Sequence, residues 1–266
     1  MLFNRPKKSL GQNFLTSMKA LADIISAAEV KRGDEILEIG PGRGALTIEL
    51  LKAGARVTAI EKDRELIPVL TELFEKEVSS GQLTIIEADI LEFDIASYVA
   101  EKSSGYKLIA NIPYYITGQI FRMFLEGDVS SEQKTQPLSM TLLVQKEVAE
   151  RVIARDGKES ILSLSVKAYG VPKYVSTVKR GSFNPAPNVD SAILHISAIS
   201  KDYFTKNKIS EAVFFTVLKA AFAHKRKIIS SNLKEKGFVL PESINQKARA
   251  EDLALEDFIQ ITRENN

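Results

Sequence analysis

The stretch from residue 34 to residue 45 constrains the fold of this chain more than any other segment. It reads Asp-Glu-Ile-Leu-Glu-Ile-Gly-Pro-Gly-Arg-Gly-Ala, an apolar strand that runs straight into a glycine-rich turn. Residues 46–51 then have the apolar spacing of a helix packed on a sheet. We therefore predict a strand–turn–helix unit. Because Gly40, Gly42 and Gly44 carry no side chains, backbone amides can approach a ligand closely at the carboxyl end of the strand.

An acidic residue at the end of the next strand points to a nucleoside ligand. Residues 56–60 form the second predicted strand, and Glu61 follows it. Glu61 lies about 20 residues beyond Gly40, the usual distance from a glycine turn to the acid that binds ribose hydroxyls. An acid after a strand is more often a solvated loop residue when it stands alone. The pattern also fits a dinucleotide, so the rest of the chain must decide which nucleoside cofactor binds.

Composition and charge exclude several classes of protein. Lys and Arg total 36 and Asp and Glu total 34, so the net charge of +2 is too balanced for an indiscriminate binder of polyanions. Any nucleic-acid contact must be local. The chain has no cysteine, which rules out disulfides, thiolate zinc sites, iron–sulfur clusters and a cysteine nucleophile. We predict no metal site. With no run of roughly 18 apolar residues and no apolar signal-peptide core, the sequence predicts a cytoplasmic protein without a membrane partner.

Strands and helices alternate along most of the chain. This alternation predicts an α/β fold with a largely parallel sheet, whose ligands bind at the carboxyl edge of the strands. Past residue 200 the strand patterns stop and the apolar residues follow helical spacing. We predict two domains, 1–199 with an N-terminal arm and 200–266 as a small helical domain. The strand patterns beyond the first two lie at 83–87, 107–110, 140–144, 175–178 and 192–196.

The fourth predicted strand runs into Asn111-Ile112-Pro113-Tyr114, and these residues suit chemistry on an adenine amine. That amine is a poor nucleophile because its lone pair is delocalised into the ring. The carboxamide oxygen of Asn111 and a backbone carbonyl of the turn can each accept one amine hydrogen and leave the lone pair aimed outward. Tyr114 would stack on the base. The competing interpretation is a plain turn at a strand exit, which Asn-x-Pro also favours.

Four separated motifs in this order resemble those of the KsgA (RsmA) family of small-subunit rRNA adenine N6,N6-dimethyltransferases. The resemblance covers nearly the whole chain. It implies a class I S-adenosylmethionine-dependent methyltransferase fold, with a Rossmann-like seven-stranded sheet and a small all-helical C-terminal domain. The motifs are Ser-Leu-Gly-Gln-Asn-Phe-Leu at 9–15, the glycine turn at 38–44, Asn-Ile-Pro-Tyr at 111–114 and Phe-Asn-Pro-Ala-Pro-Asn-Val-Asp-Ser at 183–191.

The resemblance also implies the residues of the site. In the family, the target adenine is stacked between the residues that match Tyr114 and Phe183. The sulfonium of S-adenosylmethionine is positive, so the acids Glu38, Glu61 and Asp89 at one edge suit it better than they suit the phosphates of a dinucleotide. The cofactor-binding residues implied by the resemblance are Asn13, Leu15, Gly40, Glu61, Asp89 and Asn111.

The segment 222–228, Phe-Ala-His-Lys-Arg-Lys-Ile, resembles the basic motif of this family's helical domain. It is less similar to the corresponding motif of the antibiotic-resistance relatives that act on large-subunit rRNA. A run of charges is usually only a solvated face. The candidates for neutralising rRNA phosphates are Lys7, Lys8, Lys225, Arg226 and Lys227.

The activity implied by the resemblance is dimethylation of two adjacent adenosines in the 3′-terminal hairpin of 16S rRNA. The substrate would be the small ribosomal subunit or its precursor, late in biogenesis, and the enzyme would act as a monomer. Three alternatives stay open. They are adenine methylation of large-subunit rRNA as in macrolide resistance, a ribosome assembly factor whose binding outweighs its catalysis, and a dinucleotide oxidoreductase.

Overall fold

A computed structural model of the chain describes residues 6–100, 102, 105–126 and 135–266. The chain packs as two compact units. The first comprises Met1–Ala149 and Lys173–Ile199, and the second comprises Glu150–Pro172 and Ser200–Asn266. Among the described residues, no helix is both long enough and apolar enough to span a bilayer.

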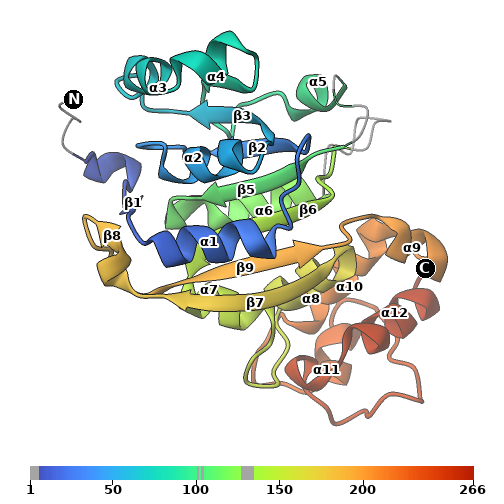
Figure 1. Cartoon of the computed structure of the whole chain (residues 1–266). Coiled ribbons are helices and arrows are strands. Elements are labelled where there is room, and N and C mark those ends of the chain that lie inside the picture. Colours follow the sequence, from blue (N-terminus) through green and yellow to red (C-terminus); the bar gives the residue numbers. More distant parts are fainter. Residues whose placement is uncertain (1–5, 101, 103–104, 127–134) are drawn as a thin grey trace. The chain divides into compact units, whose positions relative to one another are not determined.

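A seven-stranded sheet forms the centre of the first unit, as the sequence predicts (Figure 1). Its strand order is β4-β3-β2-β5-β6-β9-β7. The pairs from β4 to β6 are parallel, and β9 runs antiparallel to β6. The strands are β2 (Glu35–Ile39), β3 (Arg56–Glu61), β4 (Leu83–Glu87), β5 (Lys107–Asn111), β6 (Ser139–Gln145), β7 (Val171–Val178) and β9 (Ser191–Ser197).

The register of the central strands aligns their carboxyl ends. Ile39 of β2 pairs with Ile60 of β3 and with Ala110 of β5. The residues that follow these three, namely Gly40, Glu61 and Asn111, therefore emerge next to one another. Parallel strands bring their ends to a common edge, so residues that are far apart in sequence meet there.

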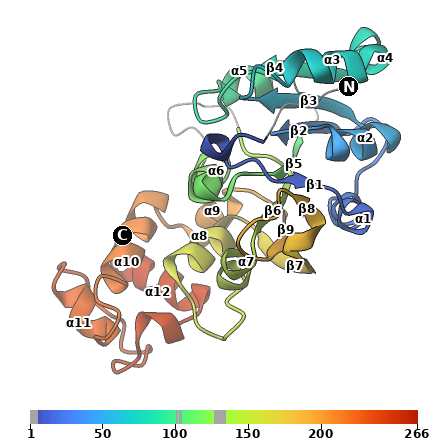
Figure 2. The ribbon, with the colours of Figure 1, turned by 90° about the vertical axis from the view of Figure 1, so that its left-hand side faces the viewer.

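Helices cover both faces of this sheet. Figures 1 and 2 show α1 and α2 on one face and α6 on the opposite face. Ser17 caps α1 through its side chain, which accepts a hydrogen bond from the Ala20 amide. The helices that begin in this unit are α1 (Met18–Ala27), α2 (Ala45–Lys52), α3 (Ile67–Leu73), α4 (Glu75–Ser79), α5 (Ile95–Ala100), α6 (Thr117–Glu126) and α7 (Lys146–Val152).

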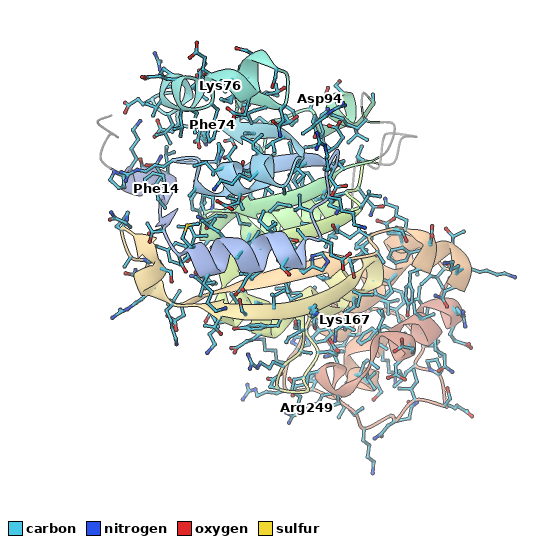
Figure 3. The ribbon with its side chains drawn as sticks, viewed as in Figure 1. Phe14, Phe74, Lys76, Asp94, Lys167 and Arg249 are labelled. Carbon is cyan, nitrogen blue, oxygen red and sulfur yellow. The ribbon has the colours of Figure 1, made fainter. Side chains whose placement is uncertain are left out.

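The entry to α2 depends on a glycine. Gly44 precedes the helix at φ +80°, a left-handed conformation that side chains disfavour. A Cβ at this position would also stand 2.7 Å from the buried ring of Phe74, a residue that is labelled in Figure 3. Close packing of the turn against Phe74 therefore requires glycine, and this contact fixes where the helix starts.

A second, two-stranded sheet that the sequence does not predict holds the N-terminal arm. Strand β1 (Phe14–Leu15) pairs antiparallel with β8 (Phe183–Asn184). The Thr16 amide extends this pairing with a hydrogen bond of 2.8 Å to the Ser182 carbonyl. The arm is thereby attached to the proline-bearing loop before β9, and its residues are held in place beside the sheet edge.

The second unit is helical, and it includes a segment that the sequence assigns to the first domain. The predicted boundary at residue 199 is one junction between the units, but Glu150–Pro172 also belongs to the second unit. Its helix α8 carries Tyr169, whose ring lies 5.4 Å from Phe204 and 5.9 Å from Phe215. These contacts between distant residues decide the division. The helices of this unit are α8 (Ile161–Tyr169), α9 (Asp202–Asn207), α10 (Glu211–Ala221), α11 (Ile229–Lys234) and α12 (Leu255–Glu264).

Candidate active site

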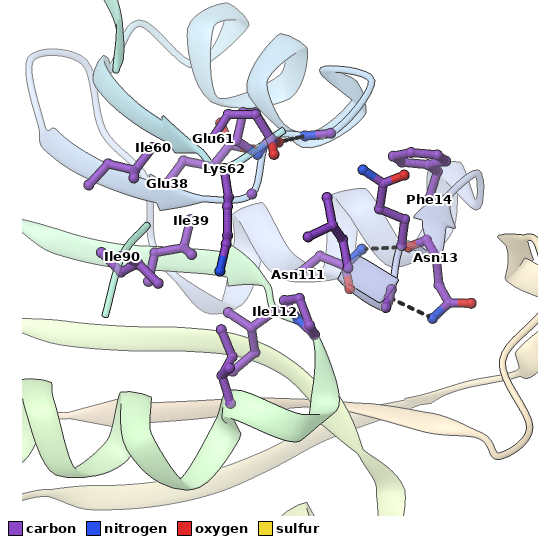
Figure 4. A pocket seen from close by; sticks show the side chains of 18 of the residues that line it. Asn13, Phe14, Glu38, Ile39, Ile60, Glu61, Lys62, Ile90, Asn111 and Ile112 are labelled. Atoms are coloured by element: carbon purple, nitrogen blue, oxygen red, sulfur yellow. Dashed lines mark hydrogen bonds between the residues drawn. The ribbon is translucent and has the colours of Figure 1, made fainter. Parts of the chain in front are cut away.

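A pocket of about 380 Å³ lies at the carboxyl edge of the sheet (Figure 4). It is lined by the N-terminal arm, the glycine turn and the residues that follow β3, β4 and β5. The six residues that the resemblance assigns to the cofactor all line it, and so does Tyr114. They are Asn13, Leu15, Gly40, Glu61, Asp89 and Asn111.

The glycine turn forms one wall of this pocket, against an aromatic ring of the arm. Gly42 has φ +59°, and a Cβ there would stand 2.9 Å from the Phe14 ring. The guanidinium of Arg43 lies over the same ring, 4.5 Å from its centroid. The arm and the turn are therefore packed together only because residue 42 has no side chain.

Glu61 is buried, with 6% of its surface exposed. Its two carboxylate oxygens accept hydrogen bonds from the backbone amides of Asp63, at 2.8 Å, and of Gly42, at 3.1 Å. Burial raises the pKa of Glu61, whereas the amide hydrogen bonds oppose that rise. The amides fix the carboxylate at the end of β3, in the position where an acid binds ribose hydroxyls.

Asp89, beyond the end of β4, is held by two neighbours. Lys62 Nζ lies 2.6 Å from one carboxylate oxygen, and the Leu91 amide donates to the other at 3.0 Å. The hydrogen bond from Lys62 holds the pKa of Asp89 below its usual value. Lys62 also lines the pocket and was not predicted to do so, although its place directly after Glu61 was a usable signal.

The arm orients the carboxamide of Asn111. The Asn111 Nδ2 donates to the backbone carbonyl of Asn13 at 3.1 Å, and the Asn13 side chain donates in turn to the Gly11 carbonyl at 3.1 Å (Figure 4). Because the amide nitrogen of Asn111 is engaged by the arm, its Oδ1 is left as an acceptor on the other side of the group.

Tyr114 is fixed through its hydroxyl group. The hydroxyl lies 2.6 Å from Ser191 Oγ at the start of β9, and Ser191 is fully buried. Burial raises the pKa of Tyr114. The neighbouring Tyr115 also lines the pocket and is 63% exposed, with its ring against Gly11. The sequence analysis did not single out Tyr115, which directly follows the Asn-Ile-Pro-Tyr motif.

Phe183 is not one of the residues that line the pocket. Its ring is 5% exposed and belongs to the hydrophobic core, outside the set of residues that line the pocket. The reason is the pairing of β8 with β1, which places Phe183 opposite Leu15. Phe183 is therefore not among the residues that line this pocket with Tyr114, and its stacking on the target adenine stays a prediction.

Asp63 anchors the beginning of the arm to the sheet edge. Its buried carboxylate takes Lys7 Nζ at 2.6 Å and Gln12 Nε2 at 2.8 Å. Lys7 also pairs with Glu65 at 3.1 Å. The sequence predicts that Lys7 neutralises an rRNA phosphate, but in the structure its charge is paired with Asp63 and Glu65. Asp63 and Gln12 were not predicted as part of the site, although Gln12 stands inside the first motif.

Of the remaining basic candidates, two are accessible and without an ion-pair partner among the described residues, namely Lys225 and Arg226. They lie in the segment between α10 and α11. Lys227 is exposed but forms an ion pair with Glu235, which also takes His224 Nε2 at 3.0 Å. The side chain of Lys8 lies outside the described part of the chain.

This pocket suits S-adenosylmethionine. The glycine turn leaves a space that side chains would fill, and Glu38, Glu61 and Asp89 supply acidic groups for a cationic ligand that carries a ribose and an adenine. Glu38 is buried and has one carboxylate oxygen with no hydrogen-bond partner among the described residues. A buried unpaired oxygen beside the glycine turn is suited to receive a donor from a ligand. The fold and the site therefore define a class I S-adenosylmethionine-dependent methyltransferase.

Comparison with known proteins narrows this class. The family model described as ribosomal RNA adenine dimethylase matches residues 3–266, and the chain belongs to this family. It is 41% identical over 268 residues to the ribosomal RNA small subunit methyltransferase A of Fusobacterium nucleatum subsp. nucleatum, covering 97% of this chain and 96% of the relative. It is 38% identical to the protein of the same name from Dehalococcoides mccartyi, covering 98% and 88%.

Two solved structures share the fold. A dimethyladenosine transferase from Plasmodium falciparum superposes with a TM-score of 0.73 at 25% identity, covering 93% of this chain and 95% of that one. The 23S rRNA methyltransferase ErmE superposes with a TM-score of 0.74 at 24% identity, covering 96% and 100%. One of these proteins is named for 23S rRNA and the name of the other specifies no RNA, so the fold alone does not identify the target.

Proposed function

We propose that this protein transfers methyl groups to the N6 amines of two adjacent adenosines in the 3′-terminal hairpin of 16S rRNA, giving dimethyladenosines. The support comes from the family and from relatives named ribosomal RNA small subunit methyltransferase A, at 38–41% identity over nearly the whole chain. Its substrate is the small ribosomal subunit or a precursor of it. The protein acts as a monomer in the cytoplasm.

The orientation of Asn111 is the observation that carries the catalytic role. With Nδ2 bound to the arm, Oδ1 accepts one hydrogen of the adenine amine. The carbonyl of Pro113 is engaged by the Ile116 amide at 3.2 Å, so the backbone acceptor for the second hydrogen is the carbonyl of Ile112. Two acceptors draw the amine towards tetrahedral geometry and direct its lone pair away from the ring.

The cofactor residues act by positioning. Asp89 binds the adenine of the cofactor, and Glu61 accepts hydrogen bonds from the ribose hydroxyls. Gly40 allows the backbone to approach the cofactor closely. Asn13 and Leu15 close the pocket from the side of the arm. When bound, S-adenosylmethionine supplies an electrophilic methyl group on a sulfonium. No side chain is required as a base, because the alkylated amine is acidic enough to lose its proton to water. The main contribution of the protein is to hold the amine in line.

Tyr114 holds the flipped base. Its ring is half-buried and its hydroxyl is tied to Ser191, so little rotamer freedom remains to be lost when a base stacks on it. Stacking on an aromatic ring is worth about 1–3 kcal/mol per base, comparable to the cost of unstacking a nucleotide. The second stacking surface is Phe183, and Tyr115, which is exposed at the pocket, offers a further ring for the base.

The helical unit binds rRNA through Lys225 and Arg226, the two accessible cations of the segment 222–228. The Asn232 side chain donates to the carbonyls of Ala221, at 2.6 Å, and His224, at 3.2 Å. These hydrogen bonds hold the stretch that directly precedes the two cations. Contacts of this kind to phosphate position the substrate and carry no sequence information.

The test is a methylation assay on undermethylated small subunits with a labelled methyl donor, followed by mass spectrometry of the rRNA. We expect label on two adjacent adenosines of the 3′-terminal hairpin. A parallel assay offers unmethylated large-subunit rRNA, and label there but not on the small subunit would establish the macrolide-resistance type of activity. Asn111→Ala should reduce transfer by at least about 100-fold, the effect of removing one preorganised transition-state contact, while binding of S-adenosylhomocysteine persists. Normal turnover in this variant would refute the assigned role.

A further inference from the structure

Three cations gather around Asp190, at the point where β9 begins. Lys146 directly follows β6, and its amide donates to the Asp190 carbonyl at 3.0 Å. Lys179 and Arg180 directly follow β7, and both donate to the Asp190 carboxylate. Lys179 Nζ binds Oδ2 at 2.8 Å, and the Arg180 amide binds Oδ1 at 3.0 Å. All four residues belong to the first unit, and we call them the Asp190 corner.

The guanidinium of Arg180 is left accessible by this arrangement. The two oxygens of Asp190 are occupied by the Lys179 ammonium and by the backbone amide of Arg180. The Arg180 side chain is exposed and has no ion-pair partner among the described residues. The hydrogen bond from Lys179 holds the pKa of Asp190 below its usual value, with the charge of Lys146 acting in the same direction. The corner therefore combines three cations with one charged carboxylate and has surplus positive charge.

The opposite end of the strand order is acidic. There Asp63 and Asp89 come shortly after β3 and β4, and the cation Lys7 faces two carboxylates, those of Asp63 and Glu65. Strands β4 and β3 stand at one end of the sheet, whereas β9 and β7 stand at the other (Figure 1). A cationic cofactor suits the acidic end, and a polyanion suits the Asp190 corner. The separation of charge thus gives the two ligands of the proposed function different ends of the sheet.

The Asp190 corner adjoins the place of the target adenosine. Ser191, the residue after Asp190, lies 2.6 Å from the hydroxyl of Tyr114, on which the proposed function stacks the target base. Phe183, the second stacking residue of the proposed function, follows Arg180 closely in the same loop. A base that enters the pocket stays attached to its strand, so the phosphates on either side of it remain at the pocket mouth. These phosphates therefore pass beside the corner.

We propose that Arg180, supported by Lys146 and Lys179, binds an rRNA phosphate adjacent to the target adenosine. This inference rests on the proposed function, because it takes the position of the target base from it. A planar guanidinium offers parallel N–H donors to two phosphate oxygens, which an ammonium group does not. Asp190 is a positioning residue, because it holds the backbone of Arg180 and leaves the guanidinium to the substrate.

The first experiment compares Arg180→Gln with the unchanged protein in methylation of undermethylated small subunits. We expect KM for the subunits to rise about tenfold, the effect of losing one charge-assisted hydrogen bond, while kcat changes by less than about twofold. The slope of log affinity against log salt, from filter binding, should become shallower by about 0.7–0.9, the value for one phosphate contact. Calorimetric affinity for S-adenosylhomocysteine should stay unchanged, because the corner lies outside the set of residues that line the pocket.

Two matched variants separate this contact from a general effect of charge. Arg180→Lys keeps the charge and should restore the salt slope, while its KM lies between those of Arg180→Gln and the unchanged protein. Lys173 is an exposed cation near the start of β7, whereas Arg180 follows the end of that strand. Lys173→Gln removes one positive charge and should leave KM and the slope unchanged. An equal rise of KM in the two glutamine variants would overturn the inference.

The second experiment locates the contact on the rRNA. The chain has no cysteine, so Arg180→Cys provides a single attachment point for an iron chelate that generates hydroxyl radicals. In the complex of the full chain with undermethylated small subunits, the radicals should cut the rRNA on either side of the two target adenosines. The same chelate attached through Lys173→Cys should not cut there.

The outcomes separate this inference from the proposed function. Unchanged KM and salt slope in Arg180→Gln would overturn the inference and leave the proposed function intact. Cuts from residue 180 that avoid the two adenosines would do the same, even if Arg180→Gln failed to fold. Failure of the unchanged protein to bind or methylate small subunits would remove the proposed function, and the inference with it.

Discussion

Gly42→Ala tests how the glycine turn and the N-terminal arm build the pocket. The substitution adds one methyl group at a position that is constrained both by its backbone conformation and by a neighbouring ring. Residue 42 has φ +59°, where a residue with a Cβ is strained, and the new Cβ would stand 2.9 Å from one carbon of the Phe14 ring and 3.0 Å from another. Ordinary contact begins at 3.4 Å, so the ring must retreat by about half an ångström.

The expected magnitude has two parts. The left-handed conformation costs about 1–2 kcal/mol for a residue with a side chain, partly offset by the lower entropy of the unfolded chain. Forcing an extra methyl into a packed contact adds typically about 1–3 kcal/mol. Moving the Phe14 ring also displaces Asn13, which directly precedes Phe14 and whose carbonyl accepts from the Asn111 amide at 3.1 Å. Losing one hydrogen bond of about 1 kcal/mol weakens ligand binding about fivefold.

Gly81→Ala is the matched control. Gly81 has φ +74°, lies in the same unit, and has no atom within 4 Å of the position of a Cβ. Both variants therefore meet the strained conformation, and only Gly42→Ala meets the ring. Thermal unfolding and S-adenosylhomocysteine titration should show that Gly42→Ala is the less stable by about 1–3 kcal/mol and alone binds more weakly. Equal unfolding temperatures with normal binding in both variants would refute the packing argument.

Two further predictions concern the arm and the helical unit. Asp63→Asn removes the negative charge that pairs with Lys7 and replaces one carboxylate oxygen by an amide nitrogen, which cannot accept a hydrogen bond. It should weaken S-adenosylhomocysteine binding about fivefold in a calorimetric titration. An unchanged affinity would mean that the arm closes without this anchor. The double substitution Lys225→Ala and Arg226→Ala should make the slope of log affinity for rRNA against log salt shallower by about 1.4–1.8, measured by filter binding. Lys227→Ala, whose charge is already paired with Glu235, should change that slope by less than half as much.

Most of the pocket was predictable because its residues follow strands. Glu61 and Asn111 are the last residues of β3 and β5, Asp89 comes shortly after β4, and all three line the pocket. Alternating strands and helices imply parallel pairing, and parallel pairing brings strand ends to one edge. The strands of the sheet and the glycine turn were accessible in the same way, since each depends on residues close together in the sequence.

The remaining features depend on contacts between distant segments. Phe183 has the composition of a stacking residue, but its pairing with Leu15 buries it in the core. The sequence predicts Lys7 as a phosphate ligand, but the folded chain places the carboxylate of Asp63 beside its ammonium group. Tyr169 has no marker in the sequence for its contacts with Phe204 and Phe215, which place its segment in the second unit.

The sequence by itself determined the order of the elements, the glycine turn, the polar groups at the strand ends and the family to which the chain is similar. Propensity, capping and apolar periodicity are local properties, so they can be read along the chain. Only the tertiary structure decided which charges are paired, which rings are buried and which carboxylate oxygen is left without a donor. These properties depend on distances between segments that are far apart in the sequence, and such distances exist only once the chain has packed.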